Sequence, residues 1–145
     1  MSIAQTTTTS FRVQLLQAVH NFDSDTFKIA LYTGAADIGP DTTAYTATGE
    51  ASGTGYTAGG NTLTVSVTPT YANNAYNVVT AYISFANTSW ANASFTARGA
   101  LIYNSSKSNK SVAVLDFGAD KTVSGQTFTI QFPTADANSA IVRIS

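Results

Sequence analysis

The spacing of apolar residues changes once along the chain, near residue 25. Between residues 10 and 20 the apolar positions recur every three or four residues, as on one side of a helix. Ser10 can cap the start of this segment, because its hydroxyl can accept a hydrogen bond from an unpaired amide of the first turn. Residues 10–20 are therefore predicted to form a short helix, which must dock through its apolar stripe to be stable.

After residue 26 apolar and polar residues alternate, a period of two that is typical of strands with one buried face. The runs predicted as strands are Phe27–Tyr32 and residues 63–67, 78–85, 100–103, 112–117, 128–132 and 141–144. Turn-forming residues separate them, and Pro69 is expected to end the second run. Short strands at this spacing with almost no helix indicate an antiparallel sandwich or barrel. The core is expected to depend on Phe27, Ile29, Leu31, Val114, Phe128 and Ile130.

Two segments lack a period that would bury one face. Residues 1–9 are polar and rich in threonine, so we expect an N-terminal arm, flexible or ordered by a partner, ahead of one domain over residues 10–145. Residues 34–60 hold seven of the ten glycines and form a long weakly patterned segment. Because long loops are uncommon in compact domains, this one is expected to be functional or ordered by a partner.

Charge is scarce, and this narrows the classes of partner. Charged residues make up 10% of the chain, against about 25% in typical globular proteins. Seven Lys and Arg nearly balance eight Asp and Glu, which leaves no basic surface for nucleic acid or an anionic membrane. The absence of cysteine excludes a disulfide framework and a thiol nucleophile. With no secretory signal and no spanning apolar stretch, the protein is expected to be made in the cytoplasm and to stay soluble, or to join something assembled there.

Residues that could carry chemistry are few. His20 is the only histidine and no catalytic signature surrounds it, so we expect no enzyme activity. Its expected role is to bond the terminal carbonyls of the helix. Asp23 and Asp25 could suggest a calcium site, but no bidentate glutamate follows them and the only glutamate is Glu50, so a capped turn is the favoured interpretation. No catalytic, cofactor-binding or metal-ligating residue is predicted, and hence no cofactor.

Aromatic residues are the remaining resource for recognition. Tyr45, Tyr56, Tyr71 and Tyr76 lie in turn-rich segments outside the predicted strands. A tyrosine in such a place can bury a large area at a small entropic cost, so these four are candidate interface residues. Alternatively, Trp90 and the loop tyrosines could stack on a sugar, although no repeated aromatic spacing supports such a platform.

Five stretches, spread over residues 11–132, share an order and spacing that point to a family. They are the amphipathic start at residues 11–19; His20-Asn21-Phe22-x-Ser24-Asp25-Thr26-Phe27-Lys28-Ile29-Ala30-Leu31-Tyr32; Gly53-x-Gly55-Tyr56-x-x-Gly59-Gly60-x-x-Leu63; Ala100-Leu101-Ile102-Tyr103-Asn104; and Asp116-Phe117-Gly118 with Val123-x-x-Gly125-x-Thr127-Phe128-x-Ile130-x-Phe132. With these stretches the chain resembles a family of small virion proteins of tailed bacteriophages.

The resemblance implies a structural protein of the virion, above all a capsid decoration (cement) protein. Such a protein binds the outer surface of the major capsid protein lattice and stabilises the head. The fold that it implies is mainly β, an antiparallel β-sandwich or jelly-roll-like domain with one short N-terminal α-helix, assembled as a homotrimer on the capsid exterior. Ile3 and Gln5 of the arm would then lie on the major capsid protein. Two alternatives stay open: a tail, neck or fibre-associated virion protein, and a carbohydrate-binding module.

Overall fold

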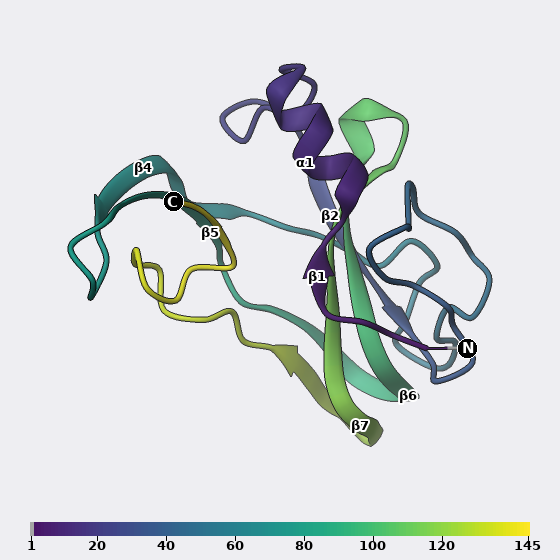
Figure 1. The fold of residues 1–145 in the computed structure, drawn as a ribbon. Helices are drawn as coiled ribbons and strands as arrows, with labels where there is room; N and C mark the ends of the chain where they lie inside the picture. The colour runs from purple at the N-terminus through teal and green to yellow at the C-terminus, as the bar shows by residue number, and fades with distance from the viewer. Residues whose placement is uncertain (1) are drawn as a thin grey trace.

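The computed structural model describes residues 2–145, which form two antiparallel sheets and one α-helix (Figure 1). The larger sheet has the strand order β1-β7-β6-β2-β3, and the smaller one β4-β5-β8. The strands are β1 (Thr6–Thr7), β2 (Phe27–Tyr32), β3 (Asn61–Thr62), β4 (Val65–Asn73), β5 (Val79–Phe85), β6 (Thr88–Asn104), β7 (Lys110–Ile130) and β8 (Val142–Ile144). The predicted mainly β, sandwich-like fold with one short α-helix is confirmed.

The hairpin of β6 and β7 is the longest part of the larger sheet. Its strands have 17 and 21 residues and are joined by a short turn that contains the 3-10 helix η1 (Ser105–Lys107). Figure 1 shows the pair running from this turn, beside α1, to a bend at the opposite end. At the bend Gly99 pairs with Asp116, but Ala97 pairs with Lys121, so four residues of β7 lie opposite one of β6. This bulge turns the outer half of the hairpin away from the inner half.

Two predicted turns are bulges within β7. The pattern predicts separate strands at residues 112–117 and 128–132, with turns near residues 118–120 and 124–125, and this division is wrong because β7 continues through both. Gly118 and Gly125 adopt positive φ angles, 77° and 64°, at the register shifts of the hairpin. Since a left-handed glycine serves a bulge as well as a turn, the residue type alone does not distinguish the two.

Two other strand boundaries differ from the prediction. The strand expected at residues 100–103 begins at Thr88 in the structure. The pattern does not predict the first part of this strand, because a register shift between Trp90 and Ala93 interrupts the alternation of apolar residues. Pro69 lies within β4 rather than at its end. There it falls in a second register shift on an edge strand, where a missing N–H costs no ladder hydrogen bond.

Helix α1 (Thr9–Leu16) is shorter than the predicted segment of residues 10–20, and its cap differs. Thr8, not Ser10, is the N-cap: its Oγ1 accepts a hydrogen bond from the N–H of Phe11 at 3.3 Å. The hydroxyl of Thr8 also lies 2.9 Å from that of Ser111 in β7, so the cap is tied to the sheet. The helix ends early because Ala18 takes a left-handed conformation with φ of 58°.

Both faces of the larger sheet are covered. On one face the main core lies between the two sheets and α1, and on the other a smaller cluster lies under residues 36–45. For this reason β2 is buried at all positions except Lys28, and not on one face only as its alternation predicts. Of the six expected core residues, Phe128 alone is half-buried, because its ring packs at the edge of the main core, against Trp90 and Phe95.

The segment of residues 34–60 is held to the sheet by the only glutamate of the chain. The Glu50 carboxylate accepts hydrogen bonds from the hydroxyls of Tyr45 and Tyr56 and from the N–H of Gly59, each at 2.7 Å. The Tyr56 hydroxyl in turn accepts from the N–H of Leu31 in β2 at 2.9 Å. Burial, together with the bond to Glu50, raises the pKa of Tyr45 to about 12. These contacts order the segment within the chain itself.

The described part of the N-terminal segment also lies on the body of the same chain. Thr6 and Thr7 form β1 and pair with β7, and Ile3 bridges to Ile38 and packs against the smaller cluster. The Gln5 side chain accepts a hydrogen bond from the N–H of Asp116 at 3.2 Å. The segment expected as an arm, flexible or ordered by a partner, thus lies on the body of the same chain over residues 2–9, with Thr6 and Thr7 as the edge strand of the larger sheet.

Substitution Glu50→Gln is expected to lower the free energy of unfolding by about 1–3 kcal/mol, since an amide N–H replaces one acceptor and leaves a donor of the network without a partner. The segment of residues 34–60 should also become sensitive to proteases. Urea unfolding and limited proteolysis at pH 7 measure both effects. Asp23→Asn is the control, because this exposed carboxylate should change stability by less than about 0.5 kcal/mol. Equal stability of the two variants would contradict a structural role for Glu50.

Candidate interaction surface

Within residues 2–145 the large, strongly exposed apolar side chains lie on α1 and on the smaller sheet with its β4–β5 turn. Within residues 2–145 the strongly exposed large apolar side chains are Val13, Leu16, Tyr71, Tyr76, Val78, Val79 and Ile144. The most exposed are Leu16 at 92%, Tyr76 at 87% and Tyr71 at 73%. A grouping of such residues on a few neighbouring elements is typical of a surface that contacts another molecule.

The strand register places several of these residues on one face. Successive residues of a strand point to opposite sides, so Val79, Ala81 and Ile83 share a face of β5. Ile83 is buried in the main core, whereas Val79 and Ala81 lie beyond its edge. Ala81 pairs with Tyr71 of β4 and with Ile144 of β8, which puts both on this same face. We call Tyr71, Val79, Ala81 and Ile144 the apolar face.

The apolar face continues the core side of the smaller sheet beyond the point where the core ends. Figure 1 shows the β4–β5 hairpin and β8 projecting away from the β6–β7 hairpin. The inner half of this sheet packs in the main core, but on the core side its outer half has no covering layer within residues 2–145. Because small sheets depend on a buried apolar face for their stability in water, the outer half is the part of the fold that gains most from a partner.

A groove runs between the end of α1 and the apolar face. Its volume is about 340 Å³, and its apolar lining includes Leu15, Phe22, Ala81, Ile83, Val142 and Ile144. None of the described residues that line it is Asp, Glu, Lys or Arg. A partner that enters the groove therefore does not strip water from an ionised group, which avoids the large cost of burying an unpaired charge.

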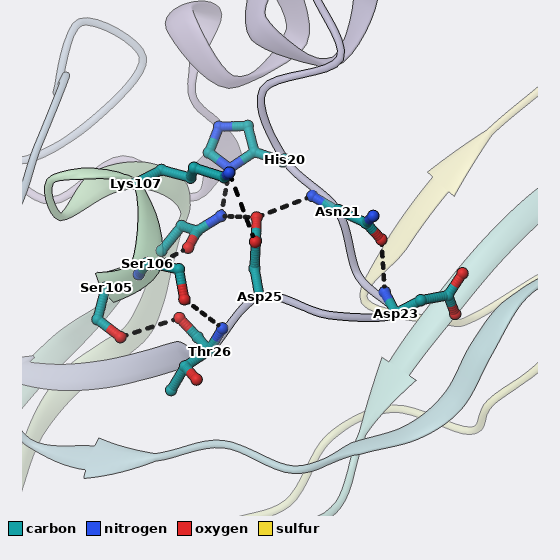
Figure 2. Close-up of polar contacts among 9 residues, drawn as sticks. His20, Asn21, Asp23, Asp25, Thr26, Ser105, Ser106 and Lys107 are labelled. Carbon is teal, nitrogen blue, oxygen red and sulfur yellow. Dashed lines mark hydrogen bonds and ion pairs between the residues drawn. The ribbon is translucent and has the colours of Figure 1, made fainter.

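His20, at the end of the α1 segment, joins this segment to the β6–β7 hairpin (Figure 2). The amide Nδ2 of Asn104 donates to His20 Nδ1 at 3.0 Å, so the imidazole proton is on Nε2, which donates to Gln14 Oε1 at 2.8 Å. The expectation that His20 bonds the terminal carbonyls of the helix is wrong: it bonds two side-chain amides. Both ring nitrogens are occupied, which fixes a neutral tautomer.

Asp25 completes this polar cluster. Its carboxylate accepts hydrogen bonds from Asn104 Nδ2 at 2.8 Å and from the N–H of Asn21 at 3.0 Å, and it lies 3.8 Å from Lys107 Nζ. Burial by itself would raise the pKa of Asp25, but the two hydrogen bonds and the Lys107 charge together lower it below its ordinary value. The bond to Asn21 agrees with the interpretation of Asp25 as part of a capped turn. No group of three potential metal ligands occurs in residues 2–145.

The six candidate interface residues fall into two groups. Ile3, Gln5, Tyr45 and Tyr56 are engaged within the chain, through packing against the smaller cluster or through hydrogen bonds of their side chains. Tyr71 and Tyr76 are exposed on the β4–β5 hairpin. The structure therefore brings Tyr71 alone of the six onto the apolar face, with Tyr76 in the turn of the same hairpin.

Sequence reasoning missed Leu16, Val79 and Ile144 as candidates for contact. Leu16 lies off the apolar stripe of the predicted helix, and this is a signal that could have identified it. Val79 and Ile144 gave no such signal, because the same strand runs also hold buried apolar residues such as Ile83 and Val142. Trp90 is buried, at 4% exposure, so its ring is not available as a sugar-stacking platform.

Comparison with protein-family models, curated protein sequences and solved structures finds no match to this chain. No helix within residues 2–145 has the length and apolar character needed to cross a membrane.

A matched pair of isoleucines tests whether the apolar face is uncovered in the isolated protein. Ile144→Ala should change the free energy of unfolding by less than about 0.5 kcal/mol, because its side chain is mostly in water. Ile83→Ala, on the same face but buried, should cost about 2–5 kcal/mol. Urea unfolding followed by tryptophan fluorescence measures both, and similar losses in the two variants would show that the face is covered.

Proposed function

We propose that the chain is a structural protein of a tailed-bacteriophage particle, a capsid decoration protein that binds the outer surface of the major capsid protein lattice and stabilises the head. The observation that carries the proposal is the apolar face with its adjoining groove, an uncovered and uncharged surface on a small domain. The sequence resemblance to small virion proteins, which spans residues 11–132, supports it.

The proposed attachment uses the apolar face, Leu16 of α1 and Tyr76 of the β4–β5 turn. Burial of apolar area contributes about 25 cal/mol per Å² removed from water, and the tyrosines add large area with few rotatable bonds. A protein that binds only the assembled lattice stabilises that lattice by the free energy of binding, in proportion to the number of copies bound. Many modest contacts of this kind would hold a shell together.

Self-association is part of the same proposal. The chain would assemble as a homotrimer on the capsid exterior, with contacts among copies and with the lattice drawn from surfaces beyond the buried core. Sedimentation of the free protein at several concentrations tests the oligomeric state, with a species three times the mass of the chain as the expected result. The N-terminal segment of residues 2–9 is not assigned a separate attachment role, because it is engaged with β7 and residues 38–40.

A double variant, Tyr71→Ser with Ile144→Ser, should bind capsids stripped of their decoration protein at least about tenfold more weakly than the unaltered chain. The reason is that loss of two central apolar contacts costs more than about 1.4 kcal/mol of binding free energy. The control is Lys121→Ser with Gln131→Ser, two exposed positions on the β6–β7 side of the molecule. Co-sedimentation with capsids at a series of concentrations gives the affinities. Unchanged affinity of the first variant would contradict attachment through the apolar face.

Copy number in purified particles separates the head from the tail. A decoration protein should be present in hundreds of copies, whereas a tail, neck or fibre-associated protein should be present in about six or twelve, because those parts follow the symmetry of closed rings. Quantitative mass spectrometry against the major capsid protein gives this ratio. A ratio near that of a tail ring would reject the decoration proposal and favour the tail.

A further inference from the structure

The side-chain amide of Asn104 is fixed in one orientation by three hydrogen bonds. Its Nδ2 donates to His20 Nδ1 at 3.0 Å and to Asp25 Oδ2 at 2.8 Å, while its Oδ1 accepts from the N–H of Ser106 at 3.0 Å. If the amide turned over, it would lose the bonds to both Asp25 and Ser106. His20 Nδ1 must therefore remain an acceptor, because a proton on it would place two donors face to face.

Charged groups approach His20 from three elements. Asp25, from the turn before β2, favours the protonated imidazole, whereas Lys107 of η1 and Lys110 of β7 disfavour it. From α1 the ring meets Gln14 and the ring of Phe11, at 5.0 Å between centroids. Burial is the largest effect, and with the two lysines it outweighs Asp25 and lowers the pKa of His20 below its ordinary value.

The position of His20 links its charge to the groove. Together with Leu15 and Phe22 it lines the groove on the α1 side. We propose that His20 is a proton-operated latch: when Nδ1 gains a proton from solvent, the bond to Asn104 is lost and residues 14–20 detach from the β6–β7 hairpin, which opens the groove beside the apolar face. At neutral pH the latch is closed.

The direction of the pH response follows from the two states of the imidazole. In the detached segment His20 has an ordinary pKa near 6.5, and in the closed structure its pKa is lower. Detachment therefore takes up a proton and becomes more favourable as the pH falls below the ordinary pKa, by about tenfold for each unit of difference between the two pKa values. Because His20 is the only histidine and the pKa of Asp25 is lowered, a response between pH 7 and pH 5 reports on this one side chain.

Hydrogen exchange of the free, full-length protein tests the latch. Exchange rates at pH 7.5 and 5.0 are divided by the rates of an unstructured peptide at the same pH. The protection of amides in residues 14–20 should fall severalfold at pH 5.0, while that of residues 112–114 in β7 stays constant. In His20→Gln, which cannot take up a proton, protection should be the same at both pH values. The same loss in this variant, or no loss in the unaltered protein, would overturn the proposal.

A second measurement serves if His20→Gln does not fold. The NMR titration of the single imidazole in the unaltered protein should give a lower pKa than in the urea-unfolded chain, and an equal or higher value would overturn the proposal.

The consequence for attachment rests on the proposed function. Detachment removes the α1 side of the groove, so capsid binding should weaken at pH 5.5 in the unaltered protein and not in His20→Gln. Failure to bind capsids at either pH rejects the proposed function, whereas unchanged hydrogen exchange rejects the latch.

Discussion

The pairing of β6 with β7 is the interaction on which the rest of the structure depends. The inner half of this hairpin, residues 99–104 with 110–116, is almost wholly buried and lies in the middle of the larger sheet. A strand pair that is buried on both faces needs a packed layer on each face, and other segments of the chain form both layers. The smaller sheet and α1 cover one face, and residues 36–45 cover the other. Each cover is positioned by strands that flank the hairpin.

Two of the few charged side chains make contacts inside the structure, and none of the described residues that line the groove is charged. Glu50 and Asp25 each accept several hydrogen bonds inside the structure, where they fix the long segment and the turn before β2. The groove beside the apolar face is lined by uncharged residues among those described. These two carboxylates thus stabilise contacts between segments of the chain. Burial of the proposed contact surface by a partner would desolvate few ionised groups. The low charge of the sequence and the proposed interface are consistent for this physical reason.

The alternation of apolar and polar residues predicts the bounds of strands without bulges, and gives wrong bounds where a bulge interrupts the strand. Phe27–Tyr32 and Val79–Phe85 follow the alternation closely and were predicted within a residue. Gly118 and Gly125 imitate turns because a bulge requires the same left-handed backbone. The role of Glu50 could not be predicted, since its three donors lie five, six and nine residues away in a segment with no regular periodicity, and nothing in that spacing indicates that they meet. The contact residues were mostly missed for a similar reason: Val79 and Ile83 look alike in sequence, and only the edge of the core separates them.

The cap of α1 has a consequence for the order in which the chain folds. Thr8 shares a hydrogen bond with Ser111, a residue 103 positions away, and β1 pairs with the same stretch of β7. The β6–β7 hairpin is closed by a short local turn, so it can form early at a small loss of chain entropy. Helix α1 is too short to persist alone and acquires its cap contact only when the hairpin exists. Helix α1, although first in the sequence, is therefore expected to form late in folding. The groove that it borders can form only after the helix has formed.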